Sequence, residues 1–201
     1  MTLLNRLHGD FVFKRRIERI AFWLASIIPQ NASVLDIGAG DGSLDSLLLK
    51  RRPDIGIEGI DVLVRPDTAI PVQKFDGRHI PFPDRSWDIA LFVDVLHHAG
   101  NAADLLAEAT RVSRAVIIKD HLNEGLLSNQ TLRLMDYVGN ARHGVALPYD
   151  YWPLSKWQAV FRQVGLVPKS WHGKLSLYPY PLTLWFDRSL HFIALLEADG
   201  A

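Results

Sequence analysis

The chain of 201 residues contains no cysteine. This excludes a disulfide framework, a thiolate nucleophile and a zinc site built from cysteine, and it agrees with a cytoplasmic location. An excess of charge of either sign is also missing, because 22 Lys and Arg residues balance 22 Asp and Glu residues. Since no global field attracts a polyanion, we do not expect the protein to bind nucleic acid.

A long hydrophobic run is missing as well. The most apolar early stretch, residues 20–28, is far shorter than the ~20 residues that span a bilayer, so we expect no transmembrane segment. The stretch follows three basic residues, as in a signal peptide, but Glu18 and Arg19 interrupt it. Apolar residues recur at helical spacing here, at positions 13, 17, 20, 24 and 27. We expect residues 1–30 to form an amphipathic helix that packs on the domain or caps a ligand site.

Length and composition predict one globular domain, because 201 residues with 48% hydrophobic side chains can bury one sizeable core. Past residue 30, strand-like and helix-like segments alternate, which is typical of a parallel sheet with crossover helices. The patterns predict strands at residues 34–37, 55–60, 72–75, 87–95, 115–119, 166–177 and 191–197. They predict helices at 43–52, 101–112 and 155–164, and a long insertion at 121–152. The last two strands are expected to be joined by a turn at 178–190.

The most informative segment is VLDIGAGDG at residues 34–42, which reads as a strand, a glycine-rich turn and the start of a helix. Glycines let the backbone turn sharply and approach a ligand, and the helix start offers free N–H groups to it. Dinucleotide sites prefer a third glycine at position 43, where this chain has Ser43. The segment therefore favours a cofactor pocket over an ordinary tight turn. A nicotinamide-dependent oxidoreductase stays an alternative.

Four successive strand ends each carry an aspartate: Asp36, Asp61, Asp76 and Asp94. Parallel strands bring their carboxyl ends to one edge of the sheet, where a carboxylate can accept both hydroxyls of a ribose. Any one of these residues could be a cap or a turn residue. Because four recur in phase, we expect one pocket that uses several of these loops.

These motifs resemble class I S-adenosylmethionine-dependent methyltransferases, specifically the small-molecule branch with a methyltransferase type 11 core. The resemblance covers residues 33–122 and implies an α/β, Rossmann-like, doubly wound sheet of seven strands, parallel except for a C-terminal antiparallel hairpin. It implies S-adenosylmethionine as cofactor and S-adenosylhomocysteine as product. The segment at residues 34–42 is similar to the first motif of the family, which borders the methionine part of the cofactor. The resemblance implies that Asp61 binds the ribose. The cofactor-binding residues that it implies are Asp36, Gly38, Ala39, Gly40, Asp61, Val62, Asp76, Gly77, Asp94 and Val95.

The sequence differs from two related methyltransferase families, and these differences limit the class of substrate. Base-methylating enzymes carry an Asn/Asp-Pro-Pro-Tyr segment where this chain has Asp94 to His97, which disfavours nucleic-acid bases. Magnesium-dependent catechol-type enzymes place acids after the fourth and fifth strands. Asp94 and Asp120 occupy comparable places, but His121 follows Asp120, whereas magnesium prefers oxygen ligands. We therefore expect no metal.

The acceptor site is expected under a helical lid formed by residues 121–152 together with the N-terminal helix. Apolar side chains in the insertion favour a small apolar or aromatic acceptor, unless they only pack the lid onto the sheet. The methyl group would move by direct SN2 transfer. A hydroxyl acceptor would call for a histidine base, and the candidates are His97, His98, His121 and His143. We expect His98 to be the base, with His121 as the alternative. A non-catalytic S-adenosylmethionine-binding regulatory module also remains open.

Overall fold

A computed structural model of the chain describes residues 3–140 and 149–200. One seven-stranded sheet has the order β3-β2-β1-β4-β5-β7-β6. Its strands are β1 (Ser33–Ile37), β2 (Gly56–Asp61), β3 (Val72–Lys74), β4 (Trp87–Val93), β5 (Ser113–His121), β6 (Leu166–His172) and β7 (His191–Ala198). The first five strands run parallel, and β7 lies antiparallel between β5 and β6. This confirms the expected α/β, Rossmann-like sheet of seven strands with an antiparallel C-terminal hairpin.

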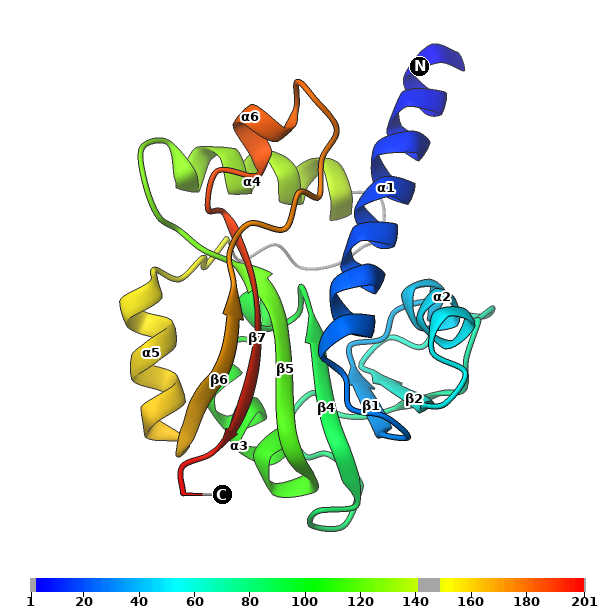
Figure 1. Cartoon of the computed structure of the whole chain (residues 1–201), viewed down its shortest axis with the longest axis vertical. Helices are drawn as coiled ribbons and strands as arrows, with labels where there is room; N and C mark the ends of the chain where they lie inside the picture. Colours follow the sequence, from blue (N-terminus) through cyan, green and yellow to red (C-terminus); the bar gives the residue numbers. More distant parts are fainter. Residues whose placement is uncertain (1–2, 141–148, 201) are drawn as a thin grey trace.

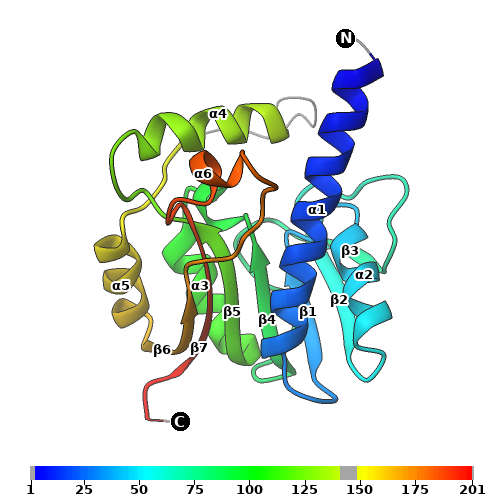
Figure 2. The ribbon, with the colours of Figure 1, turned by 45° about the horizontal axis from the view of Figure 1, so that its top comes forward.

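Helices flank the sheet and cover one of its ends (Figure 1). The helices are α1 (Leu3–Ile27), α2 (Ser43–Arg51), α3 (Ala102–Val112), α4 (Ser128–Asn140), α5 (Leu154–Gln163) and α6 (Thr183–Phe186), with a 3₁₀ turn, η1 (Leu96–His98). In both ribbon views α4 and α6 lie over the end of the sheet where the parallel strands finish (Figure 2). Helix α4 therefore lies over the β4 and β5 side of this end rather than over β2 and β3 (Figures 1 and 2).

Alternating side chains of the central strands build two cores. In β4, Ile89 and Leu91 pack with α1 and α2 on one face of the sheet. Ala90 and Phe92 pack with α3 and α5 on the opposite face. All four side chains are buried. The sheet is thus the middle of three layers, which explains why the sequence of β4 is a continuous apolar run rather than an alternating one.

Two strands end earlier than the sequence predicts. β4 stops at Val93, because Asp94 turns the backbone out of the strand with φ +58°. β6 stops at His172, although Leu175 and Leu177 beyond it are buried. Those two leucines pack in the core beside α1, outside the sheet. The expected turn between β6 and β7 also contains the short helix α6.

The N-terminal helix packs through its second half. Ile20 and Leu24 are buried, as the helical spacing predicts, and the indole N–H of Trp23 donates to the Leu175 carbonyl oxygen at 3.0 Å. Phe13 at the other end of the predicted stripe is 59% exposed, because this part of α1 extends past the sheet (Figure 1). Within residues 3–140 and 149–200, none of the helices has the length and apolar character needed to cross a membrane.

Candidate active site

The loop after β1 is held against the end of β2 by backbone contacts. The Gly38 N–H donates to the Ile60 carbonyl oxygen at 2.7 Å, and the Gly40 N–H donates to Asp61 Oδ2 at 2.8 Å. Gly38, Gly40 and Gly42 all have positive φ, a region in which other residues are strained. A Cβ on Gly59 would lie 2.6 Å from the Ala39 methyl, so this loop approaches β2 closely. The glycine spacing therefore produces the close approach that the sequence predicts.

The loops after β2 and β3 meet next to this turn. Asp61 Oδ1 accepts a hydrogen bond from the Leu63 N–H at 2.9 Å, so its carboxylate ties the first two loops together. Val62 is 53% exposed, and a Cβ on Gly77 would lie 3.0 Å from Val62 Cγ1. Asp76 accepts hydrogen bonds from two backbone N–H groups of its own turn, and these lower its pKa. Asp76 therefore shapes its own loop.

Asp36 behaves differently from the other strand-end acids, because it lies within β1 and is 4% exposed. It interacts with the carboxyl group of Asp45, a fully buried residue of α2. Burial is the main cause that raises the pKa of both acids, and the neighbouring Asp45 carboxyl group raises the pKa of Asp36 further. The sequence analysis does not include Asp45 among the site residues. It could have been found as an acidic residue on the apolar side of the predicted helix 43–52.

Asp94 is paired with two cations. It lies directly after β4 and forms ion pairs with Lys119 of β5 and with Arg16 of α1. Burial alone would raise the pKa of Asp94, but these neighbouring cations hold it well below its usual value. Lys119 is fully buried, and burial lowers its pKa. The ion pair with Asp94 places Arg16 of the N-terminal helix at the strand-end edge of the sheet.

Four histidines gather beside Asp94. His97 and His98 form η1 after β4, His121 ends β5, and His191 starts β7 directly opposite His121 in the antiparallel register. Ring centroids lie 4.0 Å apart for His97 and His98, 4.6 Å for His97 and His121, and 5.0 Å for His121 and His191. Three of the predicted base candidates are therefore neighbours. His143, the fourth candidate, lies outside the described residues.

Asp120 organises this histidine cluster. His97 Nδ1 lies 2.6 Å from Asp120 Oδ1, and the same oxygen accepts the backbone N–H of His121 at 2.7 Å. Burial lowers the pKa of His97, but the adjacent Asp120 carboxylate outweighs it and the net shift is upward. Burial lowers the pKa of His98, with a further contribution from His97, and it lowers that of His121 to about 4. His98 and His121 are therefore neutral near pH 7.

Side chains from the insertion close over the cluster. Asp136 of α4 is buried, and its Oδ1 lies 3.6 Å from His98 Nε2. The Tyr151 hydroxyl donates to Asp136 Oδ2 at 2.7 Å, and its ring lies 5.6 Å from that of His97. Leu132, Tyr151 and Leu190 form a small apolar core that holds α4 in place. Part of the apolar content of the insertion thus packs the insertion itself.

The strand-end loops fit an adenosine-type cofactor in their chemistry. The unhindered glycine turn at Gly40 provides close approach, since a Cβ there would meet nothing nearer than the Arg65 guanidinium at 3.8 Å. Asp36 Oδ1 is buried without a hydrogen-bond partner among the described residues, which leaves an acceptor oxygen at this turn. Asp61 keeps lone pairs beyond those used by backbone N–H groups.

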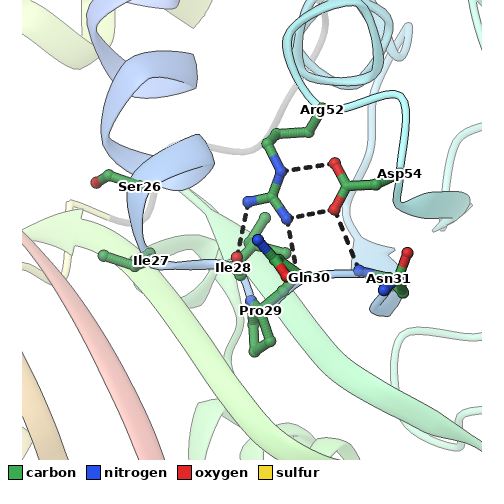
Figure 3. Close-up of a pocket in the computed structure, with 8 residues that line it drawn as sticks. All are labelled: Ser26, Ile27, Ile28, Pro29, Gln30, Asn31, Arg52 and Asp54. Atoms are coloured by element: carbon green, nitrogen blue, oxygen red, sulfur yellow. Dashed lines mark hydrogen bonds and ion pairs between the residues drawn. The ribbon is translucent and has the colours of Figure 1, made fainter.

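The hollow drawn in Figure 3 lies elsewhere, between the C-terminal end of α1 and the start of β1. Arg52 fills it with structural contacts. Its guanidinium donates to the carbonyl oxygens of Ala25, Ile28 and Pro29 and to the Asp54 carboxylate, all between 2.7 and 2.9 Å. Because the donors are used in capping α1 and binding Asp54, this hollow is not a second ligand site.

The chain matches the methyltransferase domain family over residues 9–169. It belongs to that family. It is a class I S-adenosylmethionine-dependent methyltransferase, as the sequence motifs indicated, and the nicotinamide alternative is not supported. A curated relative, the 27-O-demethylrifamycin SV methyltransferase of Amycolatopsis mediterranei (strain S699), is 25% identical over 89% of this chain and 70% of its own length.

Solved structures share the fold of this methyltransferase. An S-adenosylmethionine-dependent methyltransferase from Mesorhizobium loti has a TM-score of 0.61 at 15% identity, covering 88% of this chain and 97% of its own. The [4+2]-cyclase SpnF has a TM-score of 0.65 at 12% identity, covering 92% of this chain and 81% of its own. These likenesses concern the fold alone. What the methyltransferase acts on must be argued from its own site.

Proposed function

We propose that this methyltransferase transfers the methyl group to a hydroxyl of a small, apolar or aromatic molecule by direct SN2 displacement. The observation that carries the proposal is the buried histidine cluster, which adjoins Asp94 at the strand-end edge and lies under α4. A histidine near a methyl donor suits an acceptor that must lose a proton. The rifamycin relative, which is named for methylation of a small-molecule oxygen, supports this acceptor class.

The proposed cofactor site uses the loops after β1, β2, β3 and β4. Bound S-adenosylmethionine supplies a methyl group already activated by a sulfonium. Asp61 would bind the ribose and the Gly38–Gly40 turn would border the methionine part, as the family motif implies. Val62 and Gly77 would line the adenine, with Asp76 holding the shape of that loop. Asp36, Asp94 and Val95 complete the set of cofactor-binding residues.

The acceptor would enter beneath the lid of residues 121–152. Of the clustered histidines, His98 contacts the acceptor hydroxyl in this proposal, because its side chain is 16% exposed, whereas those of His97 and His121 are 2% and 6% exposed. Asp120 Oδ1 lies 2.6 Å from His97 Nδ1 and holds this ring in place. His97 therefore has a structural role in the proposal and does not take the proton. Positioning of the acceptor and exclusion of water would supply much of the remaining catalysis.

The cofactor site is tested by Asp61→Ala. Removing a carboxylate that binds ribose hydroxyls should weaken S-adenosylhomocysteine binding by ~1.5–3 kcal/mol, the usual scale for hydrogen bonds to a charged group. Isothermal titration calorimetry measures this loss directly. Asp67→Ala, which removes an exposed acid from the same loop, is the matched control. If a folded Asp61→Ala protein keeps its affinity, the assignment of Asp61 is wrong.

The acceptor chemistry is tested with a panel of phenols and aliphatic alcohols and quantification of S-adenosylhomocysteine. For an active hydroxyl acceptor, His98→Ala should lower turnover by about 10²-fold or more at unchanged S-adenosylhomocysteine affinity. His172→Ala, in β6, is a control outside the cluster. Full turnover in His98→Ala would point to the alternative base His121. Cofactor binding without turnover on any acceptor would favour a regulatory module.

A further inference from the structure

Two histidines and one carboxylate converge beneath α4. A ring nitrogen of His97, a ring nitrogen of His98 and a carboxylate oxygen of Asp136 all lie within 4.8 Å of one another. His98 Nε2 and Asp136 Oδ1, the facing atoms of one pair, are 3.6 Å apart. His97 and Asp136 are 3% and 4% exposed, and the His98 side chain is 16% exposed. These residue types in this number are a common ligand set for a transition metal.

The orientation of His97 supplies an independent indication of a ligand. Its Nδ1 is held by Asp120 Oδ1 at 2.6 Å, and its Nε2 is buried without a hydrogen-bond partner among the described residues. A buried polar nitrogen that lacks a partner destabilises the fold, so it calls for an explanation. A carboxylate on one imidazole nitrogen is also the usual arrangement when the other nitrogen binds a metal.

We propose that this methyltransferase binds one divalent transition-metal ion through His97 Nε2, His98 Nε2 and Asp136 Oδ1. The three ligand atoms now lie within 4.8 Å of one another, and metal–nitrogen bonds of about 2.0–2.1 Å require them to draw closer. Asp120 would position His97, and the Tyr151 hydroxyl, 2.7 Å from Asp136 Oδ2, would position the carboxylate. Nitrogen ligands favour ions of the zinc or cobalt type over magnesium.

A second group of potential ligands gives weaker support for a metal site. It consists of His97, Asp120 and His121. All three side chains are almost fully buried, and Asp120 Oδ1 is already used by His97 and by the His121 backbone N–H. Lys119 lies next to His121 and adds positive charge there. The group that contains His98 and Asp136 is the more accessible one, because the His98 side chain is 16% exposed.

Metal binding goes beyond the proposed function, because it requires neither cofactor nor acceptor. It departs from the expectation of no metal, which was based on His121 following Asp120 where magnesium would prefer an oxygen ligand. Three protein ligands leave a coordination position for water or for the acceptor hydroxyl. A hydroxyl bound there would have a lower pKa and would lose its proton to water. His98 would then act as a metal ligand rather than as the proton acceptor itself.

The test uses the full chain, freed of metal by a chelator and dialysed, and titrated with CoCl₂ and with ZnCl₂. Calorimetry should give one equivalent of each ion, and bound Co²⁺ should show visible absorption bands of a site with histidine ligands. We expect His98→Ala and Asp136→Asn to abolish the saturable step. Asp120→Asn, which keeps the shape of the positioning residue, should weaken binding by about 10–100-fold. His79→Ala, whose side chain is 70% exposed, should bind like the original chain.

The site is overturned if the original chain shows no saturable binding at one equivalent. It is equally overturned if His98→Ala and Asp136→Asn bind Co²⁺ as tightly as the original chain, because surface groups would then hold the ion. Circular dichroism checks that each variant is folded. If His98→Ala or Asp136→Asn fails to fold, the milder change Asp120→Asn still tests the metal site. S-adenosylhomocysteine titration of the metal-free protein is a separate readout. Its failure would affect the proposed function, whereas failure of the metal titration affects only this site.

Discussion

Gly38→Ala tests the geometry of the cofactor loop most directly. Gly38 has φ +87°, where an alanine is strained by roughly 1–2 kcal/mol. A Cβ there would also lie 2.5 Å from Val95 Cγ2, inside van der Waals contact, and such overpacking costs typically ~1–3 kcal/mol. Adding the two costs, we expect a loss of about 2–5 kcal/mol in the free energy of unfolding.

Gly125→Ala separates the two causes. Gly125 has φ +89°, almost the same backbone conformation, but a Cβ there would meet no atom within 4 Å. Only the strain of roughly 1–2 kcal/mol should appear in this variant. Urea denaturation measures both losses, and an unchanged m-value would show that the unfolded state is not altered. S-adenosylhomocysteine should bind more weakly to the Gly38→Ala variant and with unchanged affinity to the Gly125→Ala variant, because only Gly38 belongs to the proposed cofactor site.

A double-mutant cycle identifies the clashing side chain. Val95→Ala removes the methyl groups that meet the new Cβ, so Gly38→Ala should cost less in the Val95→Ala background than in the original chain. Equal losses for Gly38→Ala and Gly125→Ala, within about 0.5 kcal/mol, would refute the packing argument. A cycle with no coupling would do the same. Either result would mean that the loop after β1 shifts to accommodate the new Cβ and that Val95 does not clash with it.

Two further predictions concern stability away from the histidine cluster. Arg52→Ala, which removes the donors that cap the carbonyl oxygens of α1, should cost about 2 kcal/mol and lower Tm by roughly 4–8 °C, whereas exposed Arg51→Ala should leave the thermal melt unchanged. The Arg111 guanidinium lowers the pKa of Glu108 to about 2 from 4.5, so its contribution is present above pH 4.5 and is lost as the pH falls toward 2. Glu108→Gln should therefore flatten the fall of Tm between pH 5 and 3, and an unchanged slope would contradict this assignment.

The sheet was predictable because its signals are local. The central parallel strands β1, β4 and β5 contain apolar runs, and residues 34–42 identify the first crossover by themselves. The two errors in strand length have different causes. Asp94 leaves β4 through a positive φ, and Leu175 and Leu177 are buried by α1 rather than by a neighbouring strand. An apolar pattern reports burial, but it does not identify the element that provides it.

The histidine cluster was only partly predictable. His97, His98 and His121 were expected near the strand ends, but the parts that organise them come from distant elements. His191 faces His121 only because β7 pairs antiparallel with β5, a register that the sequence does not specify. Asp136 comes from α4, whose position over the sheet is set by tertiary packing. A local signal did exist at Lys119, a cation at the end of an otherwise apolar strand.

Lys119 and Arg16 show how the N-terminal helix takes part in the site. Both cations bind Asp94, yet only Lys119 is built into the sheet, and Arg16 comes from a helix 78 residues away in sequence. The Arg16 and Asp94 side chains are 23% and 18% exposed, so water screens this ion pair less than it screens a pair on the open surface. The placement of α1 and the charge balance beside the proposed methyl-donor site are therefore coupled through one ion pair. A displacement of α1 that broke this ion pair would leave Asp94 paired with Lys119 alone among the two cations.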